Sequence, residues 1–238
     1  MVTNWLQLTA CIWLATSAIS FFVVLIDVPQ RHLTMEIMKV VWPLTTLYMG
    51  PIGLYAYWSW GRLSVTHSPS ADHPTSHHEM AQHMDHHMSH RPSRPFWQSA
   101  FVSSTHCGAG CSLGDIIGEI ILATIPFVIA GSSLFTSYVV DFVLAYIIGI
   151  AFQYFSIVPM HGLTPGEGLR AALKADTASL IAYEIGMFAW MGIIRWLLPI
   201  TPAQPAYWFM MQIAMIIGFV TSYPANWVLV RRGIKHAM

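Results

Sequence analysis

The stretch FTSYVVDFVLAYIIGIAFQYFSIVPM, residues 135–160, contains a single charged side chain, Asp141. It is apolar all round, and it is longer than the roughly 20 residues that an α-helix needs to cross about 30 Å of hydrocarbon. A strand of a membrane barrel would instead show about ten residues of strict alternation between apolar and polar side chains. We therefore predict a membrane-spanning helix here.

The rest of the chain repeats this pattern. Of its 238 residues, 55% are hydrophobic and only 9% are charged, whereas an ordinary soluble domain has about 25% charged residues. This composition excludes an ordinary soluble enzyme, and a net charge of zero gives no basic excess for binding nucleic acid. We predict an all-α, polytopic integral membrane bundle with the bilayer as its solvent and about six transmembrane helices. The other five apolar stretches are 5–27, 38–60, 111–131, 177–199 and 206–230.

Basic residues predict the orientation of this bundle. Six crossings would place both termini on one side, and the segments sharing that side carry eight Lys and Arg residues against three on the other. Lys and Arg are enriched in cytoplasmic segments of membrane proteins. We therefore expect a multi-pass protein of the bacterial inner membrane with both termini in the cytoplasm.

A polar segment, 61–95, separates the second and third apolar stretches and is typical of a flexible loop. Eight of the twelve histidines fall in it, and its centre reads HHEMAQHMDHHMSH over residues 77–90. Imidazole and thioether groups together suit copper, and imidazole alone also suits zinc or nickel. The alternative is a polar linker of biased composition. The candidate ligands are His77, His78, Met80, His83, Met84, His86, His87, Met88 and His90.

The segment STHCGAGCSLGDIIGE, residues 104–119, combines soft metal ligands with acids. His106, Cys107 and Cys111 lie within six residues and could form a gate site for a soft metal ion. Asp115 and Glu119 continue the spacing of four, which places them below the thiols on one ridge of a helix. Acids inside an apolar span must face protein or water. For the two cysteines, simple packing, a disulfide and thiol chemistry remain open.

Further residues within the apolar stretches extend this hypothesis. Asp141 and Glu184 are buried-acid candidates for a polar path or for carrying protons. Several methionines recur at a spacing of four, which places each pair on one helix face. The thioether candidates, with a neighbouring histidine, are Met187, Met191, Met211, Met215, Met160 and His161.

Three segments of the chain resemble a known family. They are HCGAGCSLGD at 106–115, KADTASL at 174–180 and GFVTSYPANWVLVRRGIKHAM at 218–238. Together they are similar to the bacterial membrane family catalogued as domain of unknown function 4396, over residues from about 96 to 238. The resemblance implies a multi-helix membrane protein and a role for the His-Cys motif, and it implies no reaction.

The residue chemistry favours a membrane protein that binds and transports a soft or borderline transition metal, copper first and zinc or nickel next. The alternatives are a thiol- or metal-dependent oxidoreductase and a non-catalytic factor that delivers metal to a partner. We favour transport over catalysis. The chain has no GxxxxGK[ST] motif, so we expect no nucleotide cofactor. A second copy of the chain and a metal-donor protein are the partners left open.

Overall fold

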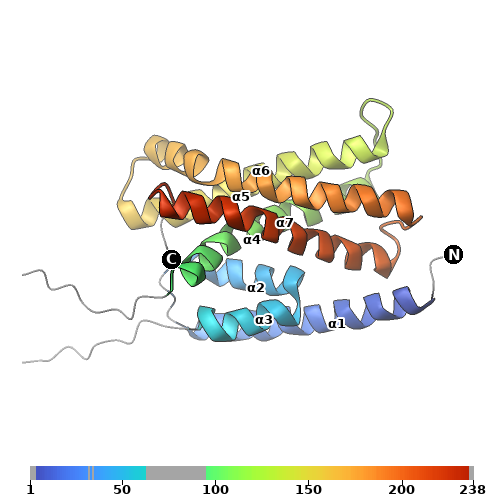
Figure 1. The fold of residues 1–238 in the computed structure, drawn as a ribbon, viewed down its shortest axis with the longest axis horizontal. Helices are drawn as coiled ribbons and strands as arrows, with labels where there is room; N and C mark the ends of the chain where they lie inside the picture. The colour runs from blue at the N-terminus through green and yellow to red at the C-terminus, as the bar shows by residue number, and fades with distance from the viewer. Residues whose placement is uncertain (1–3, 32, 34, 63–94, 236–238) are drawn as a thin grey trace, which may run out of the picture.

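A computed structural model describes residues 4–31, 33, 35–62 and 95–235 (Figure 1). Within these ranges the secondary structure is helical apart from one β-bridge between Ile129 and Ser132, which confirms the all-α prediction. The predicted His and Met ligands of the segment 61–95 lie outside the described residues.

Five described helices are long and apolar enough to cross a membrane, close to the predicted six. Figure 1 shows them running roughly side by side along the long axis of the molecule. They are α1 (Asn4–Asp27), α4 (Phe96–Thr124), α5 (Ser133–His161), α6 (Pro165–Leu197) and α7 (Pro205–Arg231).

The predicted span 38–60 is a helical hairpin in the structure. The helix α2 (Met38–Met49) ends at Gly50, and α3 (Pro51–Ala56) with the π-helical turn η2 (Tyr57–Gly61) runs back beside it (Figure 1). Gly50 has φ 59° and ψ −137°, a conformation that is readily adopted only by glycine. The 12 residues of α2 rise only about 18 Å, which is too short to cross the hydrocarbon.

This hairpin changes where the ends of the chain lie. The start of α1 and the end of α7 lie at opposite ends of the bundle in Figure 1. Our expectation of both termini on one side assumed six crossings, and it does not fit this arrangement. The two ends of the hairpin lie at the same end of the bundle. Arg31 precedes the hairpin and Arg62 follows it, and both donate hydrogen bonds to Asp27 at the end of α1, each at 3.1 Å.

Two helices begin earlier than we predicted. The helix α4 begins at Phe96 rather than near residue 111. Two of the hydroxyl groups in its first half bond to the helix backbone: Ser104 donates to the carbonyl of Ala100 at 2.8 Å, and Thr105 donates to that of Val102 at 2.6 Å. The helix α6 begins at Pro165 rather than near residue 177. Its first turn is closed by Glu167, which accepts a hydrogen bond from the main-chain N–H of Thr164 at 3.2 Å.

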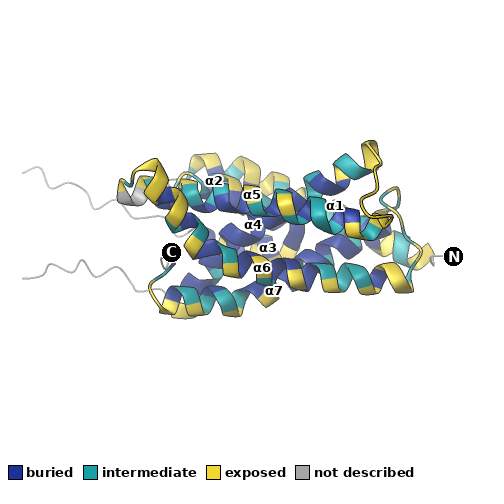
Figure 2. Cartoon of the chain, turned by 90° about the horizontal axis from the view of Figure 1, so that it is seen from above, coloured by how far each residue is buried: buried dark blue, intermediate teal, exposed yellow. Residues whose placement is uncertain are grey.

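The helix α4 is the central element of the bundle. In the most apolar 18-residue stretch of α4, 56% of the stretch is buried, against 22–39% in the corresponding stretches of the other four long helices. Figure 2 shows α4 enclosed among its neighbours. A ridge of glycines lets α5 approach closely. A Cβ placed on Gly114 would lie 2.4 Å from the Cα of Ala145, and side chains on α4 are therefore held against α5, α6 and α7.

Candidate functional site

Two clusters of buried polar side chains surround α4. We call them the paired cluster and the acid cluster, and they lie toward opposite ends of this helix. The paired cluster consists of His106, Asp176, Ser179, Asn226 and Lys235, and the acid cluster consists of Asp115, Glu119, Asp141 and Glu184.

A buried ion pair forms the centre of the paired cluster. The Lys235 ammonium donates to Asp176 Oδ1 at 2.7 Å and to Asn226 Oδ1 at 2.8 Å. Ser179 also donates to Asp176 Oδ1, at 2.9 Å. The side chains of Lys235 and Asp176 are 0% and 1% exposed. The contact of Lys235 with Asp176 joins the segment after α7 to α6, so the pair fixes the C-terminal segment to the bundle.

His106 lies beside this ion pair. It is 0% exposed, and neither ring nitrogen has a hydrogen-bond partner among the residues that the structure describes. It interacts electrostatically with both Lys235 and Asp176. The structure therefore brings one residue from each of the three family-like segments to one place.

Our sequence reasoning missed the paired cluster. The spans predicted at 177–199 and 206–230 leave out Asp176 and Lys235, whereas α6 begins at Pro165. Asp176 thus lies about 16 Å along the helix at 1.5 Å per residue. The usable signal was an acid and a lysine within the two family-like segments, 174–180 and 218–238.

The acid cluster collects all four acids that we predicted. They come from three helices: Asp115 and Glu119 from α4, Asp141 from α5 and Glu184 from α6. Asp115 interacts electrostatically with the other three. Within the described part of the chain, both carboxyl oxygens of Asp115 lack a hydrogen-bond partner, whereas Glu119 interacts with Tyr207 and Arg195, and Glu184 with Cys111. Asp115 is therefore buried among acids without a hydrogen-bond donor of its own.

The two thiols lie between the clusters. Cys107 Sγ and Cys111 Sγ are 4.0 Å apart, both residues are 0% exposed, and both cysteines are free. They pack in an apolar cluster with Tyr48 and Met211. No three His, Cys, Asp or Glu side chains of the described residues come together in a group that could hold a metal ion, so His106 does not complete a three-ligand site with the thiols.

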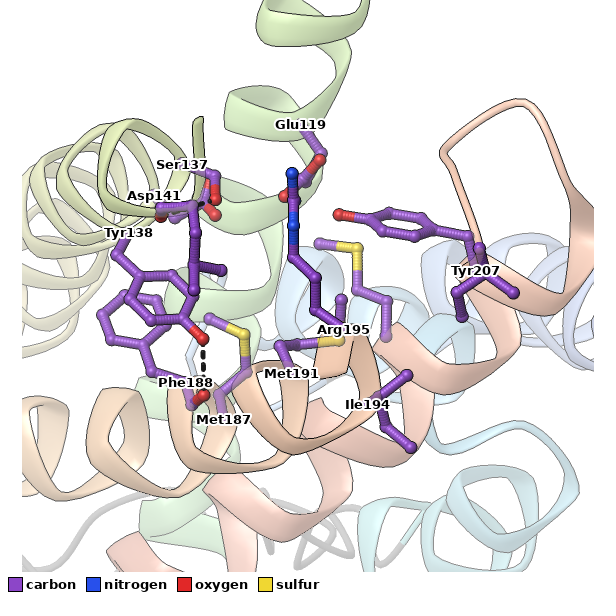
Figure 3. Close-up of a pocket in the computed structure, with 13 residues that line it drawn as sticks. Glu119, Ser137, Tyr138, Asp141, Met187, Phe188, Met191, Ile194, Arg195 and Tyr207 are labelled. Atoms are coloured by element: carbon purple, nitrogen blue, oxygen red, sulfur yellow. Dashed lines mark hydrogen bonds between the residues drawn. The ribbon is translucent and has the colours of Figure 1, made fainter. Parts of the chain in front are cut away.

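A pocket opens beside the acid cluster, between α4, α5, α6 and α7 (Figure 3). Three of the predicted thioether residues line it: Met187, Met191 and Met211. Figure 3 shows Glu119, Asp141, Arg195 and Tyr207 around the same space, with the Arg195 side chain extending toward Glu119. Soft sulfur ligands and hard oxygen ligands therefore share one pocket.

The remaining methionine candidates are not part of this pocket. Met215 packs in the apolar cluster with the two thiols. Met160 and His161 are the last two residues of α5, and their side chains lie outside the described part of the structure.

Long apolar helices around a central helix with buried ionisable groups define the class: a polytopic α-helical membrane protein. More particularly, the chain belongs to the family described as a domain of unknown function (DUF4396), whose sequence profile matches residues 96–235. No curated protein and no solved structure matches the chain. The matched region begins with the first residue of α4 and ends at Lys235, so it contains both clusters and the pocket.

Proposed function

We propose that this protein binds a soft or borderline transition metal ion, copper(I) first and zinc or nickel next, and moves it through the bundle α4–α7. The observation that carries the proposal is the pocket in which Met187, Met191 and Met211 meet carboxyl groups. Thioether sulfur is a soft ligand that selects copper(I). Three such ligands from two helices, α6 and α7, are more than either methionine pair would supply alone.

The acid cluster supports the movement of positive charge. Buried carboxyl groups that interact with one another cannot all be ionised unless cations balance them. Arg195 extends toward Glu119, and the remaining acids must hold a proton or face a bound cation. Either state suits a path for metal ions or for coupled protons, which is the role of most ionisable groups inside membrane spans.

The order of groups along α4 supports a continuous path. Glu119, Asp115, Cys111 and Cys107 follow one another at four-residue steps, each about 6 Å along the helix. Glu119 lines the methionine pocket, and Met211 belongs both to that pocket and to the apolar cluster around the thiols. An ion leaving the pocket would meet first carboxyl groups and then the thiols.

Charge distribution gives an orientation in the bacterial inner membrane. Of the eleven Lys and Arg residues, Arg91 and Arg94 lie outside the described ranges, and eight of the other nine belong to the half of the bundle where α4 begins and α7 ends. The exception is Arg195 near the end of α6. By the positive-inside rule, the C-terminus and the His- and Met-rich segment would face the cytoplasm, and the start of α1 the other side.

Two cysteine substitutions test this orientation in intact cells. Gly166→Cys, at the start of α6, should react with a membrane-impermeant maleimide only after lysis. Ala203→Cys, between α6 and α7, should react without lysis. Both are made on a Cys11→Ala background, because Cys11 is an exposed free thiol whereas Cys107 and Cys111 are buried. The opposite labelling pattern would reverse the orientation.

Copper(I) titration against a chromophoric chelator tests the pocket. For this titration, residues 76–90 are deleted from the protein, so that the His- and Met-rich segment contributes no copper binding. Changing Met187, Met191 and Met211 to Leu should weaken copper(I) binding at least about tenfold, because the soft ligands are lost at nearly constant volume. Met38→Leu, a buried methionine of α2 outside the pocket, is the matched control. Equal affinity in both variants would contradict the pocket.

Movement is tested separately from binding. Asp115→Asn removes a carboxyl group beyond the pocket, and it should slow copper(I) entry into proteoliposomes while leaving affinity unchanged. The 4.0 Å approach of Cys107 Sγ to Cys111 Sγ favours a second candidate, a thiol oxidoreductase. Changing both cysteines to Ser distinguishes the two: loss of dithiol turnover with unchanged copper(I) flux would favour the enzyme.

A further inference from the structure

The C-terminal segment turns back into the bundle after α7. Gly233, with φ 67°, reverses the chain just beyond the last residue of the helix. The main-chain N–H groups of Ile234 and Lys235 then both donate to the carbonyl of Leu229, at 3.0 and 3.2 Å. This turn directs the Lys235 side chain inward, where the residue is only 1% exposed.

The site that receives Lys235 has more polar groups than the ammonium uses. The ammonium contacts Asp176 Oδ1 and Asn226 Oδ1. The second carboxylate oxygen, Asp176 Oδ2, has no hydrogen-bond partner among the described residues, and the same holds for both ring nitrogens of His106. Asp176 Oδ2 faces α5, since it would lie 4.0 Å from a Cβ on Gly149. One turn further along α5, Gln153 Oε1 is buried and also lacks a partner within the described chain.

We infer that Asp176 and Asn226, with His106 beside them, form a binding site for a small monovalent cation, and that the Lys235 ammonium occupies it as a tethered plug. The helices α6 and α7 supply Asp176 and Asn226, α4 supplies His106, and α5 faces the second oxygen of Asp176 at Gly149. A primary ammonium ion matches the bound group in charge, size and N–H donors. This cation site is separate from the proposed copper pocket, which lies beside the acid cluster.

Lys235 reaches the site from the turn that follows α7 rather than from a helix. Lys235 lies beyond the helical hydrogen-bond ladder, and its main chain is held by the bond to Leu229. A lysine that served only to anchor α7 would be expected to leave no acceptor of Asp176 unused, because an unsatisfied buried acceptor destabilises the fold. Here one oxygen of the same carboxylate is unused while the other accepts from both Lys235 and Ser179.

Chemical rescue tests the site directly. Lys235→Ala removes the ammonium and leaves space for a free one. Its Tm in detergent should fall below that of the native chain, and methylammonium chloride should restore at least half of the loss in a saturable manner. Tetramethylammonium chloride at the same ionic strength should restore none of it, because it is larger and has no N–H donor. The native chain should respond to neither salt.

The double variant Asp176→Asn with Lys235→Ala is the matched control, because it lacks the carboxylate that holds the cation. It should not respond to methylammonium. An equal response of the single and double variants, or no response of Lys235→Ala, would overturn the inference. If Lys235→Ala can be purified only when methylammonium is present throughout, the site is supported. If it is recovered in neither condition, the plug is instead an obligatory part of the fold and the inference fails.

Discussion

The paired cluster and the acid cluster surround the same helix, α4, and both are buried, yet their carboxyl groups have opposite electrostatic surroundings. In the paired cluster, Asp176 faces the Lys235 ammonium at 2.7 Å. In the acid cluster, Asp115 interacts with three further acids, and its carboxyl oxygens have no hydrogen-bond partner in the described structure. Burial alone therefore does not tell a carboxylate that is compensated by a cation from one that is not.

A buried carboxylate with a cation and a buried acid without one differ in what their removal costs in stability. A buried carboxylate with a hydrogen-bonded cation forms a closed unit, and removal of either partner leaves an uncompensated charge. A buried acid without a partner can remain neutral by holding a proton, so its removal costs little stability. Substitutions in the two clusters should therefore differ in their effects on stability.

The largest effect is expected in the paired cluster. Lys235→Met keeps the length of the side chain and removes its charge, so that Asp176 loses its cation. We expect the free energy of unfolding to fall by about 3–5 kcal/mol, measured by thermal unfolding in detergent. The double variant Lys235→Met with Asp176→Asn should recover most of this loss. A loss below about 1 kcal/mol for Lys235→Met would mean that the pair is already open to solvent.

An intermediate effect is expected where α4 meets α5. Gly114→Ala would place a Cβ 2.4 Å from the backbone of Ala145, so the two helices must separate. The expected loss is about 1–3 kcal/mol, accompanied by weaker metal binding as Asp141 moves away from Glu119. Gly166→Ala, at an open position of α6, is the control and should be neutral or stabilising by up to about 1 kcal/mol. Equal losses would show that close packing does not hold the acid cluster together.

The smallest effect on stability is expected in the acid cluster. Asp115→Asn replaces an unpartnered carboxyl group with an amide of the same size, so the free energy of unfolding should change by less than about 1 kcal/mol. The measurement is the same thermal unfolding experiment, run beside Lys235→Met. A loss as large as that of Lys235→Met would end the contrast between the two clusters, because it would show that Asp115 has a structural partner of its own.

The sequence predicts some parts of this molecule better than others, for physical reasons. The predicted span 135–160 matches α5 (Ser133–His161), and 206–230 matches α7 (Pro205–Arg231), because composition and length alone decide whether a segment can cross a bilayer. The four acids were also predictable, since an acid in an apolar span must avoid lipid.

Other parts depend on contacts that a single sequence does not reveal. The segment 38–60 has the length of a crossing helix, and the adjacent Gly50 and Pro51 indicate that it turns back. The contact of Lys235 with Asp176 joins residues 59 positions apart, and no spacing rule predicts it. The methionine pairs were predicted from helical spacing, but only the tertiary structure shows that Met187, Met191 and Met211 line the pocket while Met215 does not.

The hairpin of α2 and α3 also brings a helix dipole into the bundle. Each helix carries roughly half a negative elementary charge at its C-terminal carbonyl groups, and α2 ends at Met49. The last turn of α2 packs against the thiol cluster through Tyr48, while Gln212 donates to the carbonyl of Leu47 at 2.7 Å. Because α3 begins at Pro51 with the same Gly50 as its N-cap, its positive end meets this negative end. The hairpin therefore closes its own dipole beside the two cysteines and leaves the charge of this region to side chains.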